Sequence, residues 1–161
     1  MRYNANALLK APIGAQMDFA VEESQCSLKG DLTVGFVHGK VRLMQTGRRI
    51  MARGNLETEI VAECVRCLEP FSLPLHIRFE ELLTFFPAKP DDKTYHIGED
   101  GHFNLEPILH EQVPLATPIQ TLCRPDCRGL CSQCGQNLNE GTCHCSASTD
   151  DPHLAALETL L

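Results

Sequence analysis

Six of the nine cysteines of this chain lie between residues 123 and 145, in the stretch "CRPDCRGLCSQCGQNLNEGTCHC". Thiols at this density either pair with one another, bind a metal or stay available for chemistry. The three interpretations are therefore a disulfide framework, a set of metal ligands and a thiol redox centre. Each would shape the C-terminal part of the fold differently, and the rest of the sequence discriminates among them.

The cellular compartment indicated by the sequence favours metal ligands over disulfides. The N-terminus "MRYNANALLKAPIGAQMDF" lacks the apolar run and cleavage site of a secretory signal, and no stretch approaches the roughly 20 apolar residues of a membrane span. We therefore expect a cytoplasmic protein without a membrane partner, in which thiols stay reduced. A thioredoxin-like redox pair would lie between a strand and a helix, and neither C-x-x-C pair of this chain does.

The later cysteines have the spacing of a complete zinc site. "CSQCG" is a C-x-x-C turn followed by a glycine, and "CHC" begins eight residues after that glycine. A C-x-x-C turn brings two sulfurs to one metal ion, and Gly135 can adopt the left-handed backbone that such a turn commonly needs. The sequence thus predicts a four-sulfur site made of Cys131, Cys134, Cys143 and Cys145.

A second site would need ligands from distant parts of the chain. Cys123 and Cys127 form a looser pair, and "CVRC" places Cys64 and Cys67 at the tip of an expected hairpin. Joining the two pairs would tie the C-terminal lobe to the sheet across a long loop, where closure by a metal stabilises most. We expect one or two structural zinc ions, because a site closed by four cysteines leaves no open position for catalysis. The ninth cysteine, Cys26, is interpreted as an ordinary packed thiol.

The fold class expected is α+β and rich in β-structure. In "GNLETEIVAEC" and "FSLPLHIRF" apolar residues recur at every second position, which is typical of strands with one buried face. The dipeptide His38-Gly39 suggests a turn between two further strands, with Leu32, Val34 and Phe36 facing inward. At least four strands are expected between residues 29 and 83, and they would form an antiparallel curled sheet or partial barrel.

The remaining segments suggest a division of the chain into two parts. Residues 87–102 are polar and rich in Pro, Gly and Asp, so an exposed loop is expected there. "NLEPILHEQV" predicts a short helix near 104–113, with Asn104 as its N-cap and Pro114 at its end. "DDPHLAALETLL" predicts a terminal helix. We therefore divide the chain into a β-rich domain, 1–118, and a zinc-binding lobe with the C-terminal helix, 119–161.

Charge is distributed unevenly along the chain. The formal net charge is -7, which disfavours indiscriminate binding to nucleic acid. In contrast, "KVRLMQTGRRIMAR" at residues 40–53 contains no acidic residue. Its five cations could contact RNA or could simply cover a solvated strand face; they are Lys40, Arg42, Arg48, Arg49 and Arg53.

Signatures of catalysis are missing from the sequence. It contains no glycine-rich phosphate loop, no H-E-x-x-H, no G-x-S-x-G and no pair of acids suited to general acid and base roles. We therefore expect neither an enzyme nor a small-molecule substrate. A thiol oxidoreductase remains an alternative class, as does a zinc-stabilised module that binds a protein partner.

The order of these motifs resembles the YceD family, the large ribosomal RNA subunit accumulation proteins. The resemblance rests on "ECVRCLEPF", on "PLATPIQTLCRPDCRGLCSQCGQNLNEGTCHC" and on the closing "DDPHLAALETLL". It implies a non-enzymatic, cytoplasmic role in building the large ribosomal subunit. Cys64 and Cys67 match the family's hairpin pair, and the six cysteines from Cys123 to Cys145 match its C-terminal cluster. Large-subunit ribosomal RNA, or a ribosomal protein bound to it, would then be the partner.

Overall fold

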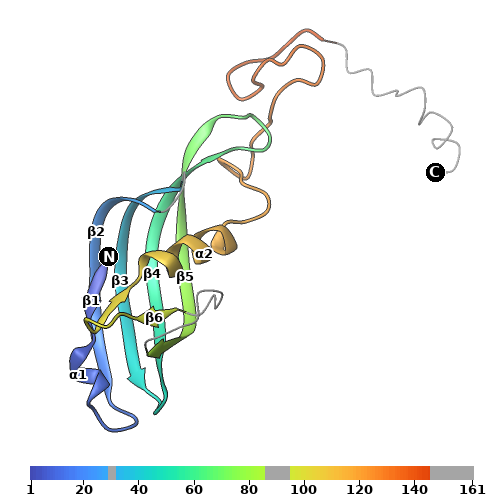
Figure 1. The fold of residues 1–161 in the computed structure, drawn as a ribbon. Helices are drawn as coiled ribbons and strands as arrows, with labels where there is room; N and C mark the ends of the chain where they lie inside the picture. The colour runs from blue at the N-terminus through green and yellow to red at the C-terminus, as the bar shows by residue number, and fades with distance from the viewer. Residues whose placement is uncertain (29–31, 86–94, 146–161) are drawn as a thin grey trace, which may run out of the picture.

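Seven strands form one curled sheet, with four long strands as its main part. The computed structural model describes residues 1–28, 32–85 and 95–145. The long strands are β2 (Gln16–Ser27), β3 (Thr33–Gln45), β4 (Arg49–Glu63) and β5 (Pro70–Phe85), which follow one another as antiparallel neighbours. Figure 1 shows them side by side, with α2 (Glu106–Ala116) lying across one face.

Three short strands complete the sheet beside β5. They are β6 (His96–Ile97), β7 (His102–Asn104) and β1 (Arg2–Asn4), and the strand order is β1-β7-β6-β5-β4-β3-β2. The β5–β6 pair is parallel and every other pair is antiparallel. The two edges approach each other, since Tyr3 of β1 lies 5.6 Å from Phe19 of β2 between ring centroids. The sheet is therefore nearly closed, and the predicted β-rich curled sheet is confirmed.

Alternating side chains build the core on the concave face of the sheet. In β4, Leu56 and Thr58 are buried while Glu57 between them is exposed, and β5 buries Leu75 and Ile77 in the same way. The helix α2 contributes a buried face that packs into this core, made of Ile108, Leu109 and Val113. The period-two pattern read from these two strands is thus confirmed.

The turn predicted at His38-Gly39 is wrong. Both residues lie within β3, which runs without interruption and pairs with β2 and β4 on either side. Gly39 has a φ of +148°, and a Cβ there would meet the backbone oxygen of Asn55 at 2.3 Å. The glycine allows two strands to approach closely instead of turning the chain. The inward position expected for Phe36 is also wrong, because Val34 and Val37 are buried and Phe36 is exposed.

Two further expectations are corrected after β5. The sequence predicts a loop over residues 87–102, but the described part of this range contains β6 and the start of β7. These strands are too short for a periodic pattern and depend on pairing with distant segments. The helix begins at Glu106, with Leu105 as its N-cap, and continues past Pro114 to Ala116. The N–H and hydroxyl of Thr117 both donate to the Val113 carbonyl and close the last turn.

The short helix α1 (Asn6–Leu9) follows β1 and buries Leu8 in the core. The terminal helix expected from "DDPHLAALETLL" lies outside the described residues. Among the residues that are described, none of the helices has the length and apolar character required to cross a membrane.

Candidate metal centres

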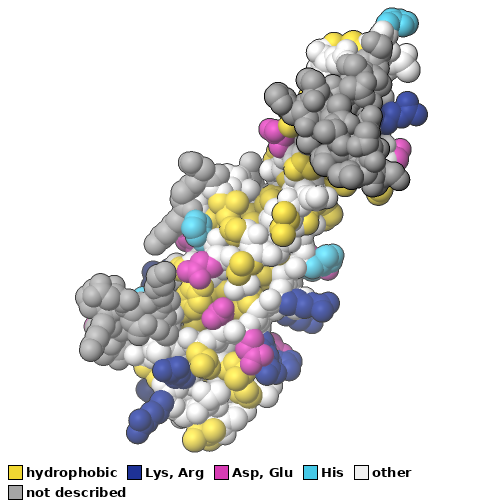
Figure 2. Space-filling model, turned by 90° about the vertical axis from the view of Figure 1, so that its right-hand side faces the viewer, with side chains coloured by type: hydrophobic (Ala, Val, Ile, Leu, Met, Phe, Trp, Pro, Cys, Tyr) yellow, Lys and Arg dark blue, Asp and Glu magenta, His cyan; other side chains and the backbone are white. Residues whose placement is uncertain are grey.

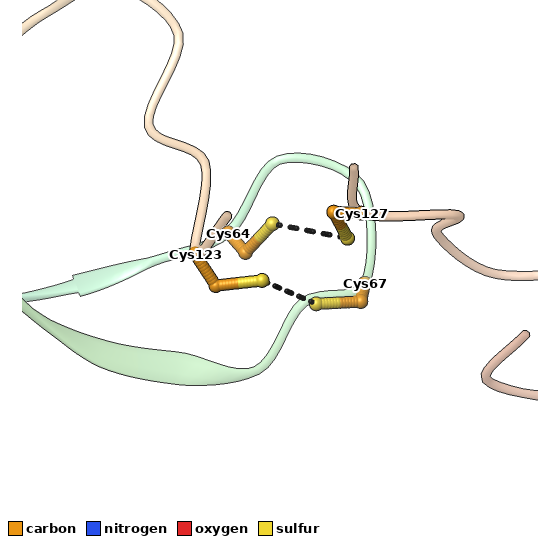
Figure 3. A group of neighbouring side chains, drawn as sticks. All are labelled: Cys64, Cys67, Cys123 and Cys127. Atoms are coloured by element: carbon orange, nitrogen blue, oxygen red, sulfur yellow. Dashed lines mark hydrogen bonds between the residues drawn. The ribbon is translucent and has the colours of Figure 1, made fainter. Parts of the chain in front are cut away.

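The cysteines at the β4–β5 tip and at the start of the C-terminal lobe form a first cluster. The sulfurs of Cys64, Cys67, Cys123 and Cys127 all lie within 4.8 Å of one another. The four side chains point toward one another (Figure 3). The Sγ atoms of Cys64 and Cys127 are 3.8 Å apart, and those of Cys67 and Cys123 are 3.7 Å apart. A zinc ion about 2.3 Å from four sulfurs at tetrahedral corners requires edges of about 3.8 Å. The spacing fits that ion, and none of the four cysteines is in a disulfide.

The backbone at the hairpin tip brings the first pair of sulfurs together. Leu68 has a φ of +60°, an uncommon value for a residue with a side chain. Its N–H donates to the Cys64 carbonyl at 2.8 Å, and the Cys64 N–H donates to the Glu69 carbonyl at 3.0 Å. The chain after Cys64 therefore folds back on itself within one tight turn, which places Cys67 beside Cys64.

Hydrogen bonds also attach the C-terminal lobe to this tip. The N–H of Val65 donates to the Thr121 carbonyl at 2.9 Å, and the Thr121 hydroxyl donates to the Glu63 carbonyl at 2.6 Å. The Arg66 guanidinium donates to the Cys127 carbonyl at 2.9 Å. Residues 121–127 therefore run along the tip, although more than fifty residues of sequence separate them from it.

The first cluster forms a small core of its own. Cys64, Cys67 and Cys127 are buried against Phe71 and Leu122, apart from the main core. A hydrogen bond from the Cys123 backbone N–H is the main reason that the pKa of Cys64 falls to about 6, although burial opposes this shift. Burial raises the pKa of the Cys123 thiol to about 12, and the neighbouring sulfurs add to this rise. Four sulfurs this close cannot all ionise unless a cation lies among them.

The second cluster is more exposed and lies wholly within the C-terminal lobe. The sulfurs of Cys131, Cys134, Cys143 and Cys145 also lie within 4.8 Å of one another. Gly135 has a φ of +73°, as the C-x-x-C-G pattern predicted, and its N–H donates to the Cys131 carbonyl at 2.9 Å. The backbone N–H groups of Cys134 and Gln133 lower the pKa of Cys131 to about 6. This environment favours the thiolate, which is the form that binds metal.

The structure brings together the same two groups of four cysteines that the spacing suggested. Cys26 lies apart from both, half-buried in β2. Sequence reasoning did not find the contacts that Asn139 and Arg66 make with the first cluster. The asparagine-rich turn "NLN", which contains Asn139, gives no local signal of what its side chains reach.

The five cations of residues 40–53 do not form a single basic patch. Arg42 makes a bidentate ion pair with Asp18 at 2.6 and 2.8 Å, and Arg53 makes one with Glu80 at 2.9 and 3.1 Å. Figure 2 likewise shows Lys and Arg side chains interspersed with Asp and Glu. Across the parts of the chain that are described, three cations of the segment have no carboxylate within ion-pair distance: Lys40, Arg48 and Arg49.

The segment and the cysteine clusters lie at opposite ends of the sheet. The β3–β4 connection, which carries Arg48, is at the bottom of Figure 1, and the lobe with the clusters extends beyond the other end of β4 and β5. Lys40, Arg42 and Arg53 line a hollow of about 300 Å³ on the outer face of β2, β3 and β4. Negative charge on the thiolates is therefore remote from Arg48 and Arg49.

Comparison with known proteins places both clusters within one family match. Residues 52–161 match the family model described as "Large ribosomal RNA subunit accumulation protein YceD". This range includes most of β4, all of β5 and all eight clustered cysteines. Of the five cations of the basic segment it includes only Arg53. No solved structure matches the chain.

Several curated proteins are similar in sequence. An uncharacterised protein of Mycobacterium tuberculosis is 31% identical over 126 residues, which cover 75% of this chain and 60% of the relative. The YlbN protein of Bacillus subtilis is 31% identical over 105 residues, or 64% of this chain and 61% of that protein. A Zea mays protein named "Large ribosomal RNA subunit accumulation protein YCED homolog 1, chloroplastic" is 24% identical over 129 residues, or 60% and 44% of the two chains.

The chain thus spans about 60% of the length of the mycobacterial relatives that it matches. The family match nevertheless covers more than half of the chain and includes both four-cysteine clusters. On this evidence, the chain belongs to the YceD family.

Proposed function

We propose that this chain is a non-enzymatic, zinc-stabilised factor that supports accumulation of large-subunit ribosomal RNA in the cytoplasm. The observation that carries this proposal is the family match, which includes the tip of β4–β5 and both cysteine clusters. In this function the two clusters hold two zinc ions, and the sheet provides the surface that contacts the partner.

The role proposed for zinc is structural. Each cluster supplies four sulfurs, which is the full coordination number of a structural zinc site and leaves no position for a substrate. The first zinc would fasten the lobe to the tip of β4–β5, and the second would hold the exposed loop of the lobe in shape. Metal bound in this way contributes directly to the free energy of folding.

We further propose that RNA contacts the segment at residues 40–53. Because the net charge is -7, a contact with phosphates must be local. Arg42 and Arg53 already pair with carboxylates, so the contact would depend chiefly on Lys40, Arg48 and Arg49. Arg48 and Arg49 are exposed at the β3–β4 connection, where a nucleic acid strand can reach both side chains.

A double charge reversal tests this contact. The change Arg48→Glu with Arg49→Glu is expected to weaken binding to a large-subunit ribosomal RNA transcript about tenfold and to make binding less dependent on salt. Binding should be measured across a salt series, together with co-sedimentation of the protein with pre-ribosomal particles. A matched control reverses two exposed cations outside the segment, Lys10→Glu with Arg128→Glu, and should affect binding much less. Equal binding by the variant and the native chain would remove the RNA contact from the proposal.

Such an outcome would favour a second candidate, a zinc-stabilised module that binds a ribosomal protein without touching RNA. The specific observation in its favour is a set of exposed apolar side chains at and near the β4–β5 tip. Val61 is 79% exposed, Val65 52% and Leu68 55%. Exposed apolar side chains that lie near one another commonly mark protein-binding surfaces.

A further inference from the structure

The side chain of Asn139 links the two cysteine clusters. Asn139 lies in the loop of the second cluster, between Cys134 and Cys143, but its Nδ2 donates to the Cys127 sulfur of the first cluster at 3.3 Å. Its Oδ1 accepts from the Arg128 backbone N–H at 2.9 Å and from Nη2 of Arg124 at 2.8 Å. Both donors belong to the segment that carries two cysteines of the first cluster.

These hydrogen bonds determine which end of the Asn139 amide faces the sulfur. Its oxygen meets two N–H donors, from Arg124 and Arg128, whereas its nitrogen meets two acceptors, Cys127 Sγ and Asn137 Oδ1 at 2.9 Å. Reversing the amide would place oxygen against both acceptors and nitrogen against both donors. The side-chain amide N–H of Asn139, on Nδ2, is therefore the group that faces Cys127.

The fold of the second cluster's loop holds Asn139 in place. Leu130 and Asn137 form an antiparallel bridge, and the Leu138 N–H donates to the Gly129 carbonyl at 2.9 Å. Asn139 follows directly, in the loop that closes when the sulfurs of Cys134 and Cys143 meet. Anything that opens the second cluster would therefore release the Asn139 side chain from Cys127.

We propose that Asn139 is a positioning residue of the first centre, through which metal binding at the second centre strengthens metal binding at the first. The inference rests on the proposed zinc binding. A hydrogen bond to a metal-bound thiolate stabilises its negative charge, and losing such an outer partner typically lowers metal affinity about 10-fold to 100-fold. Coupling of this kind is reciprocal, so the first centre strengthens the second by the same factor.

The decisive variant is Asn139→Asp, because aspartate keeps the oxygen that accepts from Arg124 and Arg128 but cannot donate to sulfur. Each full-length zinc protein is equilibrated with a graded series of a zinc chelator. The fraction of Cys64 and Cys127 protected from a short alkylation pulse is then read by peptide mass spectrometry. We expect about a tenfold loss of zinc affinity at the first centre in Asn139→Asp, and a loss of similar size in Cys131→Ser with Cys134→Ser.

The double-mutant cycle separates coupling between the two centres from a general loss of structure in the lobe. In the chain that carries Cys131→Ser and Cys134→Ser, adding Asn139→Asp should change the affinity of the first centre little, because the contact is already lost. Gln136→Ala, which removes another amide from the same loop, serves as the control. Affinity in Asn139→Asp equal to that of the native chain, or an undiminished effect without the second cluster, would overturn the coupling. Native protein without bound zinc would overturn both this inference and the proposed function.

Discussion

Replacement of both tip cysteines, Cys64→Ser with Cys67→Ser, is expected to detach the C-terminal lobe while leaving the sheet folded. Binding of structural zinc is worth about 10 to 16 kcal/mol in small zinc-binding peptides. The hydrogen bonds between tip and lobe contribute only about 1 kcal/mol each. Without zinc they cannot offset the entropy gained when the lobe is released on its long connection to the sheet.

The sheet should survive because its core is separate from the cysteine core. Cys64, Cys67 and Cys127 pack with Phe71 and Leu122, whereas the main core is formed by the long strands and α2. Limited proteolysis followed by mass spectrometry should therefore show rapid cleavage between residues 119 and 145, with circular dichroism of the β-structure retained. The control is Cys26→Ser, the same chemical change at a half-buried thiol outside both clusters. A lobe that stays as resistant as in the native chain would contradict this prediction.

Substitution of Gly39 is expected to destabilise the sheet by about 3 kcal/mol, whether the new residue is alanine or asparagine. The added Cβ would lie 2.3 Å from the Asn55 oxygen and 2.9 Å from Leu56 Cα, both of which are backbone atoms that cannot rotate away. Overpacking typically costs 1 to 3 kcal/mol, and the positive φ adds strain of similar size. Urea unfolding measures the change in the free energy of unfolding.

The comparison of substitutions also tests whether Gly39 belongs to a strand. Asparagine is well tolerated in left-handed turns, so Gly39→Asn would be nearly harmless if the chain turned at His38-Gly39. Gly14→Ala is the control, since Gly14 has a φ of +90° but no atom within 4 Å of an added Cβ. It should cost about 1 kcal/mol from backbone strain alone. A Gly39→Asn chain as stable as the native one would contradict the uninterrupted β3.

Local sequence patterns were sufficient to predict those elements whose conformation depends on residues close in sequence. The alternation from Leu56 to Ala62 indicated β4, and C-x-x-C followed by Gly135 indicated the turn of the second cluster. The first cluster, which spans the tip and the lobe, could be predicted because its four cysteines are those that remain after the second cluster and Cys26 are assigned. For the strand and the turn, one short stretch contains most of the information, because the period of a strand and the reach of a turn are fixed by backbone geometry.

Pairing between segments that are far apart in sequence explains most of the features that the sequence did not predict. β1 pairs with β7 in the register Arg2↔Asn104, and three-residue strands carry no readable period. The partner of Arg42 is 24 residues away and that of Arg53 is 27 residues away, so the basic segment looked more positive in sequence than it is in the fold. Gly39 was misread because a glycine that permits close approach of strands has the same local signature as one that permits a turn.

The proposed function requires that the eight clustered cysteines form two closed zinc sites, of which the first holds the lobe on the sheet. It is tested most directly by elemental analysis of the chain purified without added metal, together with its Cys64→Ser, Cys67→Ser variant. We expect two zinc ions per native chain and one per variant chain, because each cluster supplies a complete set of four sulfurs. No zinc in the native chain, or two zinc ions retained in the variant, would contradict it.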